Sequence, residues 1–198
     1  AYLNLAPYFQ FSYAAGAKDE PCVPIVTEET TDFTNNPRAT VAEVYQLVVD
    51  DLTYAIQTLE GFQRPNKSRI DQQVAYGLRA RAYLNMQMWA EAAADAEKAA
   101  AGYTPASMDE VSKPFLYDIN EHNWIWGYDM TTDVAMTNPY ATASAWIRSF
   151  SGDGYSAGTQ VYSCINNLLY DKIPDTDVRK GWWVDSDLDS PLLENVTW

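Results

Sequence analysis

The sequence is poor in the residues that build most metal centres and catalytic sites. Its 198 residues contain two cysteines, Cys22 and Cys164, and one histidine, His122. The cysteines lack the spacing of a zinc site, and a single histidine leaves little material for a histidine-based metal site or a Ser-His-Asp triad. We therefore predict no catalytic residue, no metal and no cofactor. Two buried free thiols are the preferred interpretation of the cysteines, and one disulfide is the alternative.

Basic residues and long apolar runs are also scarce. There are 13 Lys and Arg against 27 Asp and Glu, which gives a formal net charge of -14. Binding to nucleic acid or to an anionic membrane requires clustered basic side chains, so this charge argues against both partners. No hydrophobic stretch is long enough to span a bilayer, and no signal peptide is recognisable. We interpret the chain as a piece of a longer protein.

Aromatic residues, by contrast, are abundant. The chain has 7 Trp and 14 Tyr, and 47% of its residues are hydrophobic, enough for one domain with a sizeable core. Tyr and Trp combine a flat apolar face with a polar tip, which suits the apolar faces and hydroxyl rims of sugars. Aromatic residues also fill cores, so two interpretations stay open: these residues pack in the core, or some of them are exposed to bind a ligand.

The clearest local pattern predicts a helix from Thr40 to Leu59. Thr40 and Glu43 fit a capping box, and Gly61 is a suitable C-terminal stop. Apolar residues recur between these ends with the 3.6-residue period of an amphipathic helix. They are Val41, Val44, Tyr45, Val48, Leu52, Ile56 and Leu59.

Two further helices are predicted from Arg69 to Met88, capped by Ser68, and from Ala90 to Ala101. Together they fit a tetratricopeptide repeat, in which small and aromatic residues recur at fixed offsets. The matching residues are Tyr76, Ala80, Tyr83, Trp89, Ala92 and Ala99. Arg79 departs from the pattern, which prefers leucine there. An unrelated antiparallel helical hairpin is the alternative.

The composition changes after Pro105, where alanine-rich helix gives way to aromatics, Gly, Ser, Thr and Asn. We predict a tetratricopeptide-like helical scaffold over residues 1–105 and an irregular, aromatic-rich region over residues 106–198, packed on it within the same domain. The predicted fold is thus mainly α, with helical repeats and an irregular, partly β subregion.

Within the second region, residues 122–128 are predicted to form a strand with Trp124, Trp126 and Tyr128 on one face. That face is either buried or part of a binding surface. Residues 131–160 combine aromatics with Ser, Thr, Asn and Gly, a composition that resembles a sugar site. A lid over the helices is the alternative, and a short helix is predicted over residues 162–170.

Several segments, taken in order along the chain, resemble the SusD/RagB-like family. They are Cys22-Val23-Pro24-Ile25-Val26, the R-x-T-V-x-x-V-Y run from Arg38 to Tyr45 with Asp50-Asp51-Leu52 and Ala55 after it, the repeat unit from Ala75 to Ala100, and Leu169-Tyr170 with Asp177-Val178-Arg179. Each motif alone is weak, but their order along nearly the whole chain is fairly specific.

The resemblance implies a surface lipoprotein of the outer membrane that binds glycans, or peptides in some members, and covers a SusC-like TonB-dependent transporter. The lipid anchor on the N-terminus would lie outside this chain. By analogy, aromatics after the helical unit would bind the ligand, and we favour Tyr128, Tyr140, Trp146 and Tyr155.

Two other functions are weighed against glycan capture. One is a protein-interaction scaffold of the same transporter complex that binds no sugar. The other is a glycoside hydrolase, which needs two carboxylates about 5–10 Å apart. The acidic residues offer many pairs, but most lie on predicted helix faces or in charge runs, where a solvated face is the usual explanation. We therefore predict a binding protein and no enzyme.

Overall fold

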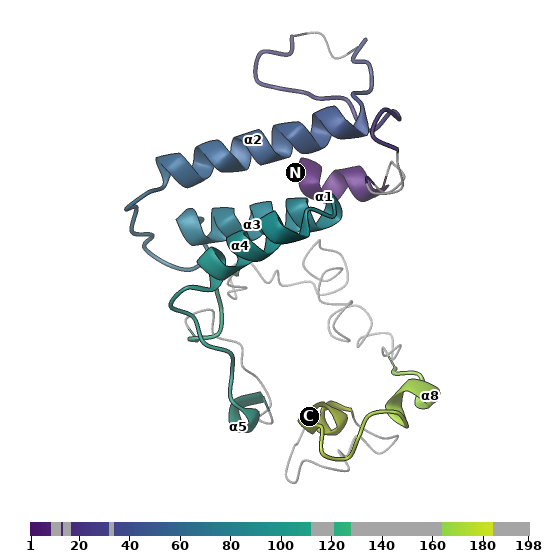
Figure 1. The fold of residues 1–198 in the computed structure, drawn as a ribbon, viewed down its shortest axis with the longest axis vertical. Helices are drawn as coiled ribbons and strands as arrows, with labels where there is room; N and C mark the ends of the chain where they lie inside the picture. Colours follow the sequence, from purple (N-terminus) through teal and green to yellow (C-terminus); the bar gives the residue numbers. More distant parts are fainter. Residues whose placement is uncertain (9–12, 14–16, 32–33, 112–120, 128–163, 184–198) are drawn as a thin grey trace, which may run out of the picture. The chain divides into compact units, whose positions relative to one another are not determined.

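In the computed structural model, residues 1–8, 13, 17–31, 34–111, 121–127 and 164–183 are described (Figure 1). The chain divides into two compact units, residues 1–104 with 122–127 and residues 105–121 with 128–198. Over the described ranges the regular structure is helical, and the only strand-like pairing is an isolated bridge between Pro21 and Thr40. The mainly α fold is confirmed. The division at residue 105 stays a prediction.

The longest helix, α2, spans Val41–Thr58 and confirms the first helix prediction. Thr40 and Glu43 form the expected capping box. The Glu43 N–H donates to Thr40 Oγ1 over 3.2 Å, and the Thr40 N–H donates to Glu43 Oε2 over 2.8 Å. The backbone N–H of Thr40 thereby lowers the pKa of Glu43. Gly61 follows the helix with a φ of 73°, as a C-terminal stop requires.

Two segments from the family-like motifs, around Cys22 and around Arg38, are hydrogen-bonded to each other next to the start of α2. The Cys22 N–H donates to the Ala39 carbonyl over 2.7 Å, and the Ala39 N–H donates to the Val23 carbonyl over 3.1 Å. The Arg38 guanidinium donates to the carbonyls of Pro21, over 2.7 Å, and of Cys22. These motif residues therefore hold the backbone together. Their polar atoms are engaged within the protein.

A small core forms where the N-terminal segment meets α2. The short helix α1, Tyr2–Leu5, is followed by the 3-10 turn η1, Ala6–Tyr8. The Tyr2 hydroxyl donates to the Val26 carbonyl and accepts from the Val26 N–H, so α1 is tied to the loop before α2. The buried members of this core are Ala6, Cys22, Val23, Val41, Val44 and Tyr45.

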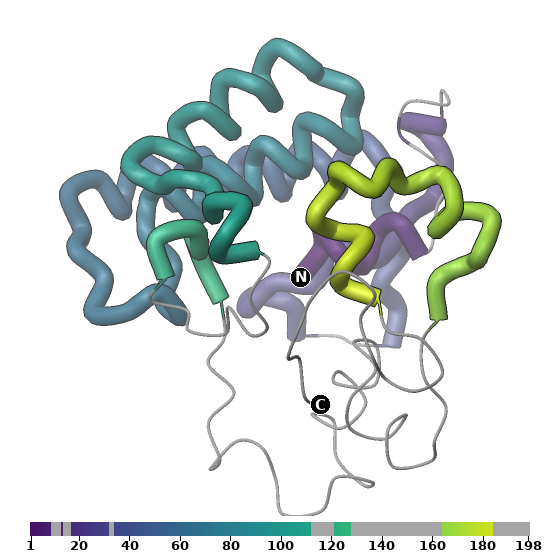
Figure 2. Tube along the Cα trace, turned by 90° about the horizontal axis from the view of Figure 1, so that it is seen from below, coloured from purple at the N-terminus to yellow at the C-terminus, as the bar shows by residue number. Residues whose placement is uncertain are grey.

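Helices α3, Gln72–Asn85, and α4, Trp89–Ala100, form an antiparallel hairpin that packs on α2 (Figures 1 and 2). The predicted start of α3 was wrong by three residues. Asp71 caps the helix by accepting from the Val74 N–H over 2.9 Å, whereas Ser68 bonds to Asn66. A charged cap nearer the apolar stripe displaces the serine, because only one residue can occupy the N-cap.

The turn between α3 and α4 has the hydrogen bonds of a Schellman motif. The Met88 N–H donates to the Tyr83 carbonyl over 2.9 Å, and the Gln87 N–H donates to the Leu84 carbonyl over 3.1 Å. Gln87 takes a φ of 57°, the left-handed conformation that glycine usually supplies. The helix consequently ends before Met88, the residue to which the prediction extended it.

One buried ion pair joins all three long helices. Arg79 of α3 donates to both carboxylate oxygens of Asp95 on α4, over 2.6 and 2.9 Å, and to Thr53 of α2 over 2.8 Å. Asp95 is only 3% exposed. The hydrogen bonds to Asp95 raise the pKa of Arg79. Arg79, which departs from the repeat pattern, therefore links the helices.

The described part of the second unit holds α5, Met108–Val111, α8, Asn167–Tyr170, and the 3-10 turn η3, Val178–Trp182. The Trp182 indole donates to the Val111 carbonyl over 2.7 Å and links η3 to α5. The Arg179 side chain binds both carboxylate oxygens of Asp177, which lowers the pKa of Asp177 to about 2. The predicted short helix over 162–170 begins only at Asn167, after residues 164–166 without helix.

Both cysteines are free thiols. Cys22 is buried, and burial raises the pKa of its thiol, whereas Cys164 is exposed in its own unit. The expectation of two buried thiols is thus correct for Cys22 only. Among the helices of the described ranges, none has the length and apolar character needed to cross a membrane.

Candidate functional site

Arg64 fastens the segment 121–127 to the helical unit. Its guanidinium pairs with Asp71 over 2.7 Å and donates to the Tyr103 hydroxyl and the Ile125 carbonyl, each over 2.6 Å. The Arg64 side chain is only 8% exposed. A charge so well buried is stable only with partners, and these three lie on different parts of the chain. Arg64 therefore determines where the segment lies.

Further hydrogen bonds hold this segment, among them one between His122 Nδ1 and Thr104 Oγ1 over 2.8 Å. The Gly127 N–H donates to the Lys67 carbonyl over 3.2 Å, and the Trp126 indole N–H donates to the Ser68 carbonyl over 3.2 Å. The partners in these last two bonds are loop carbonyls, and residues 121–127 form turns and bends. The strand predicted over 122–128 is therefore wrong in residues 122–127, because aromatic alternation alone does not supply a neighbouring strand to pair with.

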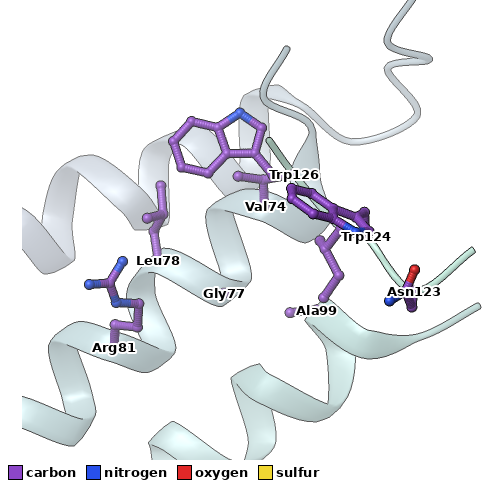
Figure 3. Close-up of a pocket in the computed structure, with 9 residues that line it drawn as sticks. Val74, Gly77, Leu78, Arg81, Ala99, Asn123, Trp124 and Trp126 are labelled. Carbon is purple, nitrogen blue, oxygen red and sulfur yellow. The ribbon is translucent and has the colours of Figure 1, made fainter. Parts of the chain in front are cut away.

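The anchored segment forms one wall of a pocket of about 420 Å³, and α3 with the end of α4 forms the other (Figure 3). The lining residues are Val74, Gly77, Leu78, Arg81, Ala99, Asn123, Trp124, Ile125 and Trp126. Trp124 is half-buried and Trp126 is 45% exposed, so both indoles reach the surface of this unit. Binding pockets for small molecules combine such apolar walls with few polar groups.

Gly77 lies on the floor of this pocket, between Val74 and Leu78 (Figure 3). A glycine inside a helix costs about 1 kcal/mol relative to alanine. Contact with α4 does not demand the glycine, since a Cβ added at this position would stand 3.5 Å from the Ala99 Cβ, an ordinary van der Waals contact. Because Gly77 has no side chain, it leaves open space in the pocket beneath the two indoles.

The polar groups of the pocket are Arg81 and Asn123. Neither side chain has a hydrogen bond or an ion pair to any residue that the structure describes. None of the described lining residues is acidic. The guanidinium offers five N–H donors and the amide offers both donors and an acceptor. The pocket can therefore supply aromatic faces together with unengaged hydrogen-bonding groups.

The four residues favoured from the sequence, Tyr128, Tyr140, Trp146 and Tyr155, lie outside the described residues, and their part in a site stays a prediction. For Trp124 and Trp126, the sequence left a buried face and a binding surface open. The structure leaves Trp126 exposed and Trp124 partly buried, so this face is not fully buried, and its part in binding stays a prediction. The sequence gave no reason to single out Arg81 or Asn123. Arg81 does follow Val74 and Leu78 at helical spacing, but the wall opposite them is distant in sequence.

A second hollow, of about 470 Å³, lies beside the start of α2 and is lined by Ile25, Asn36, Pro37, Arg38, Ala39 and Glu43. Its charged groups already have partners, because Arg38 binds carbonyls and Glu43 completes the capping box. No group of three or more metal-ligating side chains exists among residues with a described placement. The pocket beneath Trp124 and Trp126 is thus the stronger candidate.

Comparisons with known proteins agree with the resemblance seen in the sequence. A SusD-like family profile, described as starch-binding associating with outer membrane, matches residues 1–84. A SusD-like carbohydrate binding protein from Bacteroides vulgatus has a similar structure, with a TM-score of 0.71 and 26% identity over 90% of this chain and 37% of its own. A SusD superfamily protein from Bacteroides thetaiotaomicron is 30% identical over 56% of this chain and 25% of its own, with a TM-score of 0.49.

No curated protein sequence matches the chain. The chain spans 37% of the length of the similar structure from Bacteroides vulgatus. The profile match includes the residues of α3 that line the pocket, and it ends before Asn123 and the two indoles.

Proposed function

We propose that the chain is a member of the SusD-like family and that it binds glycans without catalysis at the surface of the outer membrane. The profile match over residues 1–84 and the similar structure from Bacteroides vulgatus support this proposal. The observation that carries the proposal is the pocket of Trp124 and Trp126 over the floor of α3. A pyranose ring has an apolar face that stacks on an indole and a rim of hydroxyls that Arg81 and Asn123 suit. The ligand is then captured by stacking and hydrogen bonds.

Such a site binds weakly. Stacking on one or two aromatic faces leaves only a few kcal/mol after the costs of association, so we expect dissociation constants on the order of micromolar to millimolar. Weak binding suits a protein that passes its ligand on. We propose that the recipient is a SusC-like TonB-dependent transporter, and that an N-terminal lipid anchor outside this chain holds the protein at the membrane.

The lining of the pocket supports binding over hydrolysis. Glycosidases place two carboxyl groups about 5–10 Å apart around the scissile bond. Among the residues that the structure describes, no acidic side chain lines this pocket, so they offer a bound glycan no such pair. The alternative of a peptide- or protein-interaction scaffold in the same transporter complex is distinguished by the choice of ligand.

The test is affinity electrophoresis of the whole gene product, and of the 198-residue chain, through gels that contain one polysaccharide each. Trp124→Ala and Trp126→Ala probe the pocket, and Tyr140→Ala and Trp146→Ala probe the residues predicted from sequence. Trp89→Ala is the matched control, because Trp89 is 59% exposed on α4 and does not line the pocket.

We expect one class of glycan to retard the protein, and Trp126→Ala to lose that retardation while its circular dichroism stays unchanged. Retention of binding in both pocket variants, with loss in Tyr140→Ala or Trp146→Ala, would move the site to the second region. Free migration of the whole gene product through every glycan would reject glycan binding in favour of the interaction scaffold.

A further inference from the structure

The pocket differs in charge from the rest of the chain. The protein carries 27 acidic residues against 13 basic ones, yet the described part of the lining has one arginine and no acid. The other arginines of the helical hairpin and its preceding loop are used structurally where they are buried, as Arg64 pairs with Asp71 and Arg79 with Asp95. Arg81 is exposed and has no partner among residues that the structure places.

The position of Arg81 relates it to the stacking surface. Val74, Leu78 and Arg81 follow one another on one face of α3, which Trp126 overlies at its Val74 end (Figure 3). A sugar ring that stacks on an indole presents its substituents edge-on, toward the rim of the pocket. Arg81 lies at this rim, where a guanidinium suits the substituents of a ring whose face stacks on an indole.

The substituent that matches a free guanidinium is a carboxylate. Arginine binds a carboxylate through two parallel N–H···O bonds, and such charge-assisted bonds are stronger than those to a neutral hydroxyl. An uncharged hydroxymethyl group would leave most of the five donors to water. Because the described lining residues include no acid, they exert no like-charge repulsion on an anionic ligand.

We propose that this pocket selects saccharides that contain uronic-acid residues, with Arg81 binding the carboxylate while Trp126 stacks on the ring. The proposal rests on the proposed function and specifies its class of ligand. Asn123 would accept or donate a hydrogen bond at a neighbouring hydroxyl of the sugar. The chain's overall charge makes the preference local, because any long-range electrostatic effect would disfavour an anion.

The experiment is isothermal titration calorimetry of the whole gene product with a matched pair of probes. One is tetragalacturonate, and the other is its carboxyl-reduced, neutral counterpart, which keeps the same linkages. A tetraglutamate peptide tests whether charge alone is recognised. Arg81→Gln removes the proposed contact, and Arg69→Gln removes the same charge from an exposed arginine that does not line the pocket.

We expect the acidic saccharide to bind about fivefold tighter than the neutral one, the size of effect that an exposed ion pair supplies. Arg81→Gln should abolish this difference by weakening the acidic saccharide more than the neutral one, whereas Arg69→Gln should preserve it. The difference should also shrink as salt is raised.

Three results would overturn the proposal, and they separate it from the broader function. Equal binding of the two saccharides leaves glycan capture standing and removes the selectivity for acid. A preference that survives Arg81→Gln places the recognition of charge elsewhere. Binding of neither saccharide, with tetraglutamate bound, rejects both the selectivity and the glycan function.

Discussion

Arg79 is the residue at which the sequence pattern and the packing diverge. A tetratricopeptide helix prefers leucine at this position, and here a guanidinium binds Asp95 and Thr53 across the contact of three helices. Its side chain is 14% exposed and that of Asp95 is 5% exposed. The rings of Tyr76 and Tyr83 lie 5.6 and 5.7 Å from the guanidinium carbon. A cation enclosed in this way stays favourable through its carboxylate and the flanking aromatic faces.

Replacement of Asp95 with alanine should lower the free energy of unfolding by about 3 kcal/mol, because it leaves the Arg79 charge buried without its partner. Urea denaturation followed by circular dichroism measures the change. The double variant Arg79→Leu/Asp95→Leu, which restores the repeat pattern, should unfold within about 1 kcal/mol of the natural chain. Glu97→Ala, an exposed acid on the same helix, is the control and should change stability by less than about 0.5 kcal/mol.

At the scale of helices, the sequence predicted their existence better than their ends. The capping box at Thr40 was predictable because both of its residues lie within one turn. The start of α3 was missed because Ser68 and Asp71 are both good N-caps, and only the packing of Val74 decides between them. The end of α3 was missed because Gln87 gives no sign, by residue type, of a left-handed turn.

Gln87→Gly should stabilise the α3–α4 hairpin. A left-handed backbone costs a residue with a Cβ roughly 1–2 kcal/mol, and glycine escapes this cost while losing more entropy on folding. We expect a net gain of about 0.5–1 kcal/mol in the free energy of unfolding. Gln87→Ala keeps the Cβ and should give no gain. A glycine variant no more stable than the alanine variant would mean that the left-handed backbone at this position costs no more than the entropy that glycine loses on folding.

At the scale of the whole molecule, the helical class and the resemblance to the SusD-like family were accessible from sequence, and the pocket was not. Helices follow from local periodicity, and the family-like motifs turn out to hold the backbone at the start of α2. The pocket instead joins α3 to residues 123–126, about 40 residues further along the chain. Only Trp124 and Trp126 could be suspected, since nothing local relates them to Arg81.

Arg64→Gln should loosen the pocket without touching its ligand. It removes the bond to the Ile125 carbonyl and the pairing with Asp71, so segment 121–127 loses its main anchor. Amide exchange at Gly127, whose N–H binds the Lys67 carbonyl, should become at least about tenfold faster, the effect of 1.4 kcal/mol. Glycan affinity should fall in parallel.

Hydrogen exchange and calorimetry on the same preparations check both effects. Arg69→Gln again serves as the control for charge. Unchanged exchange at Gly127 in Arg64→Gln would show that the remaining contacts suffice to hold the segment.

The hydrogen bonds that hold segment 121–127 bear on how ligand preference can evolve. Arg64 donates a hydrogen bond to the Ile125 carbonyl, and the Lys67 carbonyl accepts one from the Gly127 N–H. On the side of the segment, these two bonds involve backbone atoms alone. Any amino acid other than proline offers the same backbone atoms. Side chains at 123 and 124 can accordingly be exchanged while the loop keeps its attachment. Residues 123 and 124 are therefore suitable positions to randomise in a library. Substitutions there would also allow related chains to change their ligand specificity while the helices stay the same.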